Sequence, residues 1–372
     1  MKNTNSISIN TLITTFLFIS ILPFSFFCSG QTIHTADNNP GAIGGVNIYT
    51  GATALTDAIA AATAGDIIHV VRGANDYGAT VVDKQLSIFG IGLNADTDGG
   101  ELSIVSGITI ADPVASGTRI SGLNITNQLA LGGVAGSLNN LLIENSRIRW
   151  IQHASATTTI SSMIIRNNVI GSGFSTNEEE IDLLAGAISN ITIANNVLYV
   201  TSSIGNHGVI TASNGTSVEN NLFVGIGNAA YFAFENFDGN TVTNNIFYGL
   251  RPWAIGSFTN NTFTNNISFG TGADGFSTSG GNTSTANLTT QDPLLLNVPL
   301  AATIDFSTFD PTLDTGSPAL GSGTSGTDMG VFGGGSPMTL EGTLIPTIQT
   351  VTLPSIVVKG DNLPVQIKAK GN

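Results

Sequence analysis

A short motif recurs along the middle of the chain: an apolar residue, any residue, Asn, then Asn or Ser, with apolar residues close behind. Its first asparagine falls at Asn145, Asn167, Asn195, Asn220, Asn244 and Asn265. The steps between these positions are 22, 28, 25, 24 and 21 residues. A period of about 20 to 30 residues is typical of solenoids, whose repeats stack and cover one another's apolar interior.

The residue types separate two kinds of solenoid, the leucine-rich repeat and the β-helix. The apolar positions of the motif hold mostly Ile, Val and Phe, and Gly, Ser, Thr and Asn flank them. These residues favour strands and tight turns, whereas a leucine-rich repeat needs Leu at fixed offsets and a helical half. The sequence therefore predicts an all-β chain, a single right-handed parallel β-helix whose strands stack about 4.8 Å apart.

Stacking such coils aligns the paired asparagines in two columns. Asn tolerates left-handed backbone conformations at turns, and its amide carries both donors and an acceptor. We therefore expect an asparagine ladder at one corner of the coil, and a ligand role for these side chains is the alternative. An apolar column beside it is expected to lie in the core, and it consists of Ile170, Leu198, Phe223 and Phe247.

The two ends of the predicted solenoid differ in character from its middle. Residues 54–64 place Ala58, Ile59 and Ala62 on one face at helical spacing, with Gly65 as a stop signal, which predicts a capping helix. The β-helix is expected over residues 31–335. After that, four prolines separate short apolar runs, which indicates an extended tail over 336–372.

Residues 1–30 have the order of a secretory signal peptide. Lys2 precedes an apolar run from Leu12 to Phe27, and Ser29 and Gly30 provide small residues at a cleavage site. The prediction is export to the cell surface or the medium, with no membrane span after cleavage. A retained anchor and lipid attachment at Cys28, the only cysteine, are the alternatives.

The charge balance restricts the partners of the exported part. The chain carries a net charge of −14, and residues 1–30 hold one lysine and no acid, so the remainder carries −15. Such a surface repels nucleic-acid phosphates, which excludes nucleic acid as a partner. It also repels acidic polysaccharides unless a cation bridges the two.

Several segments resemble the secreted pectate-lyase-like β-helix proteins. The sequences at Leu55–Val70 and Asp83–Gly92 are similar to the opening of these proteins, and those at Gln291–Asn297 and Gly316–Gly334 to an ending common in bacterial surface β-helix proteins. The resemblance covers roughly residues 45–335 and implies this fold, export and a bacterial origin. It does not select an activity, because the family includes lyases, hydrolases and binding proteins.

The resemblance to lyases implies a basic residue near a sugar carboxylate and acidic residues that hold calcium, whereas a hydrolase needs two placed carboxylates. The candidate catalytic residues are Arg149, Arg166, Asp182 and Arg251. Arg166 also aligns with Glu144 of the preceding coil, where a surface ion pair is the simpler interpretation.

An acidic run offers the one candidate metal site, for calcium. It contains Glu178, Glu179, Glu180 and Asp182, and carboxylate oxygens are the ligands that calcium prefers. The spacing matches no known calcium loop, so a solvated acidic loop is the alternative, and no cofactor other than calcium is expected.

Aromatic and imidazole side chains recur in the segments that follow successive ladder strands. They are Trp150, His153, His207, Tyr231 and Trp253, and they include both tryptophans of the chain. Rings on a flat sheet suit the apolar faces of sugars, which predicts a substrate-binding face. Strand alternation could also turn some of these side chains inward.

Together these features predict an exported, monomeric protein that engages a polysaccharide or surface glycan as a binding or structural element. A polysaccharide lyase or glycoside hydrolase of the same fold is the first alternative. An inert structural adhesin is the second.

Overall fold

The computed structural model describes residues 30–93, 101–171, 180–199, 208–212, 214–225, 230–299, 305, 307–340, 347–352 and 366–370. Thr32–Asn372 form one compact unit, which contains all of the described strands. The predicted signal peptide lies outside the described residues apart from Gly30.

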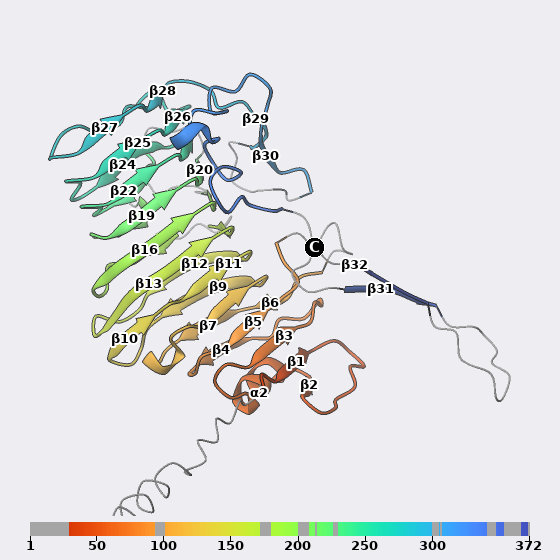
Figure 1. Ribbon diagram of the computed structural model, residues 1–372. Coiled ribbons are helices and arrows are strands. Elements are labelled where there is room, and N and C mark those ends of the chain that lie inside the picture. Colours follow the sequence, from red (N-terminus) through yellow and green to blue (C-terminus); the bar gives the residue numbers. More distant parts are fainter. Residues whose placement is uncertain are drawn as a thin grey trace, which may run out of the picture. The chain divides into compact units, whose positions relative to one another are not determined.

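Two large parallel sheets make up most of this unit, and their strands stack in nearly sequential order (Figure 1). The 13-stranded sheet contains β1 (Ile33–Asp37), β2 (Ile48–Thr50), β3 (Ile67–Val70), β5 (Ser87–Phe89), β8 (Arg119–Ser121), β10 (Gly136–Asn139), β11 (Leu142–Glu144), β13 (Thr158–Arg166), β16 (Ile188–Ala194), β19 (Thr216–Glu219), β22 (Thr241–Thr243), β25 (Thr262–Thr264) and β27 (Thr283–Thr285). We call it the first wall.

The 15-stranded sheet bends into two further walls. It contains β4 (Ala79–Val82), β6 (Ile104–Val105), β7 (Gly107–Ile110), β9 (Asn124–Leu131), β12 (Arg147–His153), β14 (Val169–Ile170), β15 (Ile181–Asp182), β17 (Val197–Tyr199), β18 (Gly208–Thr211), β20 (Leu222–Val224), β21 (Phe232–Glu235), β23 (Ile246–Tyr248), β24 (Arg251–Ile255), β26 (Ile267–Phe269) and β28 (Leu288–Thr289). The long strand β12 pairs with β14 at Arg147 and Ile148, but with β15 at Ile151 and Gln152. The second wall therefore runs β14-β17-β20-β23-β26-β28 and the third β15-β18-β21-β24.

Each complete coil thus contributes one strand to each of three walls around a common apolar interior. Side chains on the inner faces, such as Ile143, Ile165, Ile193 and Val218 of the first wall, are fully buried. The predicted parallel β-helix is confirmed.

A single α-helix, α2 (Ala54–Ala61), occurs among the described residues, where the capping helix was expected. It buries Ala54, Leu55, Ala58 and Ile59 against the first strands, and its hydroxyl and charged groups face outward. Lys84 Nζ donates hydrogen bonds to the Ile59 and Ala62 carbonyl oxygens, which satisfies and neutralises the C-terminal end of the helix. The helix ends before the predicted limit at residue 64.

The predicted asparagine ladder forms from the second asparagine of each pair. Asn168, Asn196, Asn221, Asn245 and Asn266 are fully buried, as is Ser146 at the start of the column. Each amide oxygen accepts hydrogen bonds from the preceding coil: Asn221 Oδ1 accepts from Asn196 N at 2.9 Å and from Asn196 Nδ2 at 3.0 Å. The ladder continues to Asn287, so it binds successive coils together along the axis.

The first asparagine of each pair has a different role. These residues adopt positive φ, between 51° and 59°, and so make the turn from the first wall to the second. The side chains of the last four bind the C-terminal part of the chain: Asn195 Nδ2 donates to Val331 O and Gly333 O, and Asn265 Nδ2 donates to Ser322 O. Asn244 Oδ1 accepts from Thr324 N at 2.9 Å.

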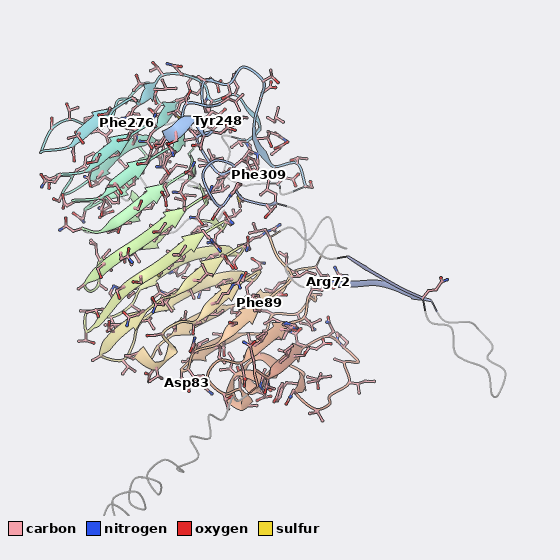
Figure 2. The ribbon with its side chains drawn as sticks, viewed as in Figure 1. Arg72, Asp83, Phe89, Tyr248, Phe276 and Phe309 are labelled. Atoms are coloured by element: carbon pink, nitrogen blue, oxygen red, sulfur yellow. The ribbon has the colours of Figure 1, made fainter. Side chains whose placement is uncertain are left out.

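The C-terminal part returns along the outside of the second wall. The last stacked strands are β27 and β28, so the β-helix of the described chain ends near residue 289 and not at the predicted residue 335. The returning segment includes the antiparallel pair β29 (Leu295–Asn297) and β30 (Asp310–Leu313), and the 3-10 turn Thr324–Gly326. A second apolar cluster joins it to the wall and includes Tyr248 and Phe309 (Figure 2). Another 3-10 turn spans Pro113–Ala115, and β31 (Thr347–Thr352) pairs antiparallel with β32 (Gln366–Lys370).

A buried carboxylate fastens the first coil. Asp66 accepts hydrogen bonds from Thr32 N at 2.8 Å, from Thr63 N at 2.7 Å and from Thr63 Oγ1 at 2.9 Å, and its Oδ2 lies 3.3 Å from His34 Nε2. Burial raises the pKa of this carboxyl, but the hydrogen bonds outweigh burial and lower the pKa from 3.8 to about 2.

This shift predicts a pH-dependent stability. Because the folded-state pKa lies below the ordinary value, the ionised Asp66 stabilises the fold above about pH 4, and the contribution is lost as the pH falls toward about 2. Asp66→Asn is expected to lower the midpoint of thermal unfolding at neutral pH, and the difference from the wild type should shrink over that acidic range. Thermal unfolding followed by circular dichroism at a series of pH values tests this. The control is Asp83→Asn, because the Asp83 side chain is 61% exposed. A difference that stays constant down to pH 2 contradicts the prediction.

Candidate functional site

The outer surface of the third wall gathers most of the predicted site residues. On its inner side Ile151, Ile181, Ile210 and Phe234 pair in register and are fully buried. Since side chains alternate along a strand, the next residues form a column on the outer side. This polar column consists of Gln152, Asp182, Thr211 and Glu235, of which Thr211 is buried at 3% exposure.

Hydrogen bonds fix the first part of the polar column. Gln128 Nε2 donates to Gln152 Oε1, and Gln152 Nε2 lies 3.5 Å from Asp182 Oδ2. Asp182 Oδ1 accepts from Leu184 N at 3.0 Å. The carboxylate of Asp182 is therefore held on the outer surface of the wall by its neighbours.

An arginine and a tryptophan lie at one end of the polar column, where β12 bends from the second wall to the third. The guanidinium carbon of Arg149 lies 4.4 Å from the centroid of the Trp150 ring, within the range of a cation–π contact. Both side chains are half-buried. The strand changes walls between Ile148 and Ile151, so the side chains of Arg149 and Trp150 do not alternate between the inside and the outside of the coil.

A second arginine–aromatic cluster lies on β24. The guanidinium carbon of Arg251 lies 4.8 Å from the Trp253 ring and 5.1 Å from the Phe232 ring. The pairing of β21 with β24 shifts between Phe232 and Phe234, which gives β24 one extra residue and turns Trp253 outward. Trp253 is 36% exposed, and its Nε1 donates to Gly275 O.

The two clusters lie on one surface, four strand steps apart, or about 19 Å at ordinary strand spacing. We call this surface the arginine–tryptophan face. It consists of Arg149, Trp150, Gln152, Asp182, Phe232, Glu235, Arg251 and Trp253. Its centre is polar and its two ends combine a flat ring with a flat cation.

Two residues predicted for this face do not lie on it. His153 is fully buried: its Nε2 donates to Thr158 O at 2.9 Å and its Nδ1 accepts from Gly186 N at 3.2 Å. Burial lowers the pKa of this imidazole, which keeps the ring neutral in that pattern of hydrogen bonds. Tyr231 is 6% exposed and packs in the main core. His153 is buried because side chains alternate along β12, whereas Tyr231 immediately precedes β21, and His207 lies outside the described residues.

The predicted calcium site is only partly described. Glu178 and Glu179 lie outside the described residues, Glu180 is 6% exposed, and Asp182 belongs to the polar column. In the part of the chain that the structure describes, no three His, Cys, Asp or Glu side chains converge. Calcium binding by this run stays a prediction.

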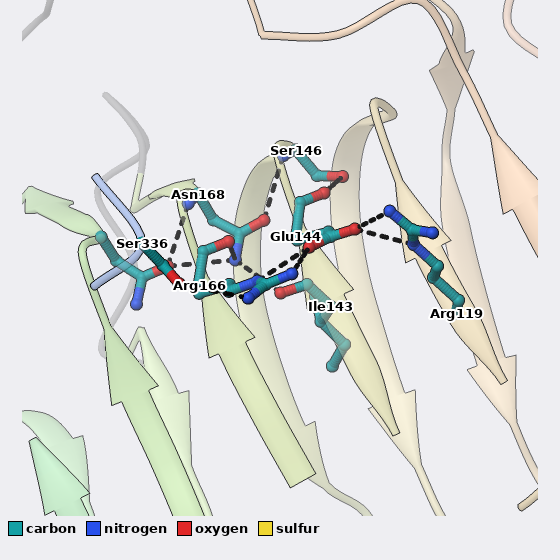
Figure 3. Close-up of polar contacts among 8 residues, drawn as sticks. Arg119, Ile143, Glu144, Ser146, Arg166, Asn168 and Ser336 are labelled. Atoms are coloured by element: carbon teal, nitrogen blue, oxygen red, sulfur yellow. Dashed lines mark hydrogen bonds and ion pairs between the residues drawn. The ribbon is translucent and has the colours of Figure 1, made fainter. Parts of the chain in front are cut away.

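Arg166 lies on the first wall, away from the other catalytic candidates. Figure 3 shows it with Glu144 and Arg119. Glu144 Oε2 accepts from Arg166 Nε at 2.8 Å and forms an ion pair with Arg166 Nη2 at 2.8 Å, and Oε1 accepts from Arg119 Nε at 2.7 Å. The expected surface ion pair is therefore a buried carboxylate between two arginines, with Arg119 also 4.9 Å from the Phe89 ring.

The four catalytic candidates therefore do not meet at one point. Arg149, Asp182 and Arg251 lie on β12, β15 and β24 of the third wall, whereas Arg166 is on β13 of the first wall and occupied by Glu144. The described residues bring together an elongated surface with spaced polar groups, a geometry that suits binding along a chain.

No known family's sequence profile matches the chain, and no curated protein sequence matches it. The crystal structure of an alginate lyase from Paenibacillus sp. str. FPU-7 is similar over 69% of this chain and 99% of that chain, at 14% identity and a TM-score of 0.25. None of the helices in the described residues has the length and apolarity needed to cross a membrane.

Proposed function

We propose that this chain is an exported protein that binds polysaccharide along its arginine–tryptophan face. The observation that carries the proposal is the pairing of each indole on this face with an arginine, at the two ends of one polar column. The signal-peptide pattern of residues 1–30 supports export to the cell surface or the medium.

The chemistry of the face fits a sugar chain with acidic groups. An indole ring offers an apolar surface to the C–H face of a sugar, while amide and carboxylate groups between the rings orient hydroxyls. A guanidinium forms two parallel hydrogen bonds with a carboxylate. The two arginines balance the carboxylates of Asp182 and Glu235 on this face, so on a chain whose net charge is −14 an acidic glycan would be repelled less here than elsewhere.

Trp253→Ala is the variant that tests this proposal. The variant also removes one of the two rings that Arg251 contacts, so the affinity for a bound polysaccharide is expected to fall roughly tenfold, or about 1–2 kcal/mol. Trp253 is partly exposed and lies outside the apolar clusters, so the melting temperature should change little. Affinity electrophoresis of residues 31–372 against a panel of neutral and acidic polysaccharides, with and without calcium, measures the effect.

The matched control is Leu296→Ala, another exposed apolar side chain, which lies on β29 of the returning segment. It should leave retention unchanged. Equal losses in the two variants, or full retention by Trp253→Ala, would contradict the proposed face.

A glycoside hydrolase is the second candidate, and one observation favours it. Asp182 and Glu235 occupy the same column two strand steps apart, so their Cα atoms are separated by roughly 9–10 Å. Carboxylate pairs in inverting glycosidases are about 6.5–9.5 Å apart. New reducing ends in the same panel would favour hydrolysis, unsaturated ends would indicate a lyase, and retention alone would support binding. The absence of both retention and cleavage would favour an inert adhesin.

A further inference from the structure

A regular array of threonines covers the outer face of the first wall near its C-terminal end. Strands β22, β25 and β27 read Thr-Val-Thr, Thr-Phe-Thr and Thr-Ser-Thr (Figure 1). Their Cα pairing is in register, so Thr241, Thr262 and Thr283 form one row and Thr243, Thr264 and Thr285 form the other. We call these six residues the threonine lattice. Thr192 and Ser217 extend the first row by two further coils.

The lattice faces solvent and its hydroxyl groups are free. Four of its members are exposed, and Thr243 and Thr264 are half-buried. No hydrogen bond joins any of the six hydroxyls to another group of the described chain, whereas hydroxyls elsewhere on the coils, such as that of Thr158, bind a backbone carbonyl. The array therefore presents six unsatisfied donors and acceptors to water.

The backbone beneath the lattice is held rigidly. Val242 and Phe263, the middle residues of two strands, are fully buried in the core. Asparagine ladders fix both ends of these strands: Asn240, Asn261 and Asn282 bind one another before the strands, and Asn245, Asn266 and Asn287 do so after them. Threonine is branched at Cβ, so its χ1 is restricted as well. The hydroxyl and methyl positions are thus fixed by the fold.

The spacing of the lattice follows from the strand geometry. Neighbouring strands lie about 4.7–4.9 Å apart, and residues two apart on one strand are separated by roughly 6.6–6.8 Å. The first repeat is close to one repeat of the water oxygens on a prism face of ice, and the second is roughly a tenth shorter than the other. A flat array of methyl groups and hydroxyls with these repeats holds water in positions that an ice surface continues.

From this match we infer that the threonine lattice binds ice. The lattice itself contains no charged or aromatic side chain, in contrast to the arginine–tryptophan face on the third wall. A sugar chain would find neither a ring to stack on nor a cation there. The function is additional to glycan binding, lies on a different wall, and does not depend on it.

Ice growth in the presence of the mature chain, residues 31–372, tests the inference. The wild type is expected to produce thermal hysteresis and to inhibit ice recrystallisation. Thr262→Tyr places a bulky ring at the centre of the lattice and should remove most of that activity, a several-fold loss at equal concentration. Thr283→Val on the last coil keeps the shape, removes one hydroxyl and should cause a smaller loss, which remains measurable if Thr262→Tyr fails to fold.

Thr159→Tyr is the matched control, because Thr159 is exposed on the same wall but outside the lattice, with its hydroxyl bonded to Ser137. It should retain the full effect on ice. No effect of the wild type on ice would overturn the inference, as would an effect that Thr262→Tyr and Thr283→Val leave intact. Polysaccharide retention is measured on the same samples. If Thr262→Tyr loses retention but keeps the full activity on ice, the inference is also overturned.

Discussion

Replacing Asn221 by leucine is expected to lower the free energy of unfolding by about 3–5 kcal/mol, because several buried hydrogen bonds lose their partner together. Asn221 Oδ1 accepts from Asn196 N and Nδ2, and Asn221 Nδ2 donates to Ile193 O at 2.8 Å. The site is fully buried, so water cannot replace these bonds. Leucine has the same branched shape and the same number of side-chain heavy atoms, so the substitution leaves no cavity and the loss reflects the polar contacts. Chemical denaturation followed by circular dichroism measures the change.

Asn287→Leu at the end of the same ladder provides the comparison. Asn287 is half-buried, and its Nδ2 donates hydrogen bonds to Phe263 O and to Ser284 Oγ. Water can reach it, so a loss of about 1 kcal/mol is expected. Equal effects at Asn221 and Asn287 would show that burial does not determine the strength of the ladder.

The sequence was sufficient to predict the coil and its ladder, because both depend on short-range order. The Asn-Asn motif has two physical requirements, a left-handed turn residue and an amide that fits between coils, and they fall on adjacent positions such as Asn220 and Asn221. Repetition at a nearly constant interval then determines the stacking. A second ladder at Asn240, Asn261 and Asn282 has the same kind of signal, a 21-residue spacing before Thr-x-Thr, but it was not predicted.

The contacts that the sequence did not predict join residues far apart in the chain. Asn195 binds Val331 and Gly333, and Asn244 binds Thr324, over separations of 80 residues or more. No local pattern specifies such pairs, so the sequence assigned residues 291–334 to the coils, whereas the described part of this segment packs against the second wall. Arg119 was missed for a similar reason, since it precedes the first recognisable copy of the motif.

The candidate site was predicted in part, and the errors concern the direction in which side chains point. Trp150 and Trp253 lie on the outer surface, but His153 and Tyr231 are buried. The direction of a strand side chain depends on its position relative to each bend and bulge. The bend in β12 and the extra residue in β24 are tertiary features, and no repeat in the sequence records them.

Glu144→Ala is expected to cost about 2–4 kcal/mol of unfolding free energy. The carboxylate is 1% exposed and holds Arg119 and Arg166 on opposite sides, so its removal leaves two guanidinium groups of like charge facing each other. The loss is kept below that of a fully buried pair because the arginine side chains are 39% and 32% exposed and partly rehydrate. Urea denaturation at low salt measures it.

The double variant separates the two possible origins of that cost. If repulsion between the arginines contributes, Arg166→Ala in the Glu144→Ala background should restore part of the stability, whereas Arg166→Ala alone should destabilise because Glu144 then keeps only Arg119. Glu219→Ala is the matched control on the same column of the first wall, where its neighbours in register are Ala194 and Thr243. It should change stability little. A loss at Glu219 equal to that at Glu144, or a double variant less stable than Glu144→Ala, would show that the arginine pair does not depend on this carboxylate.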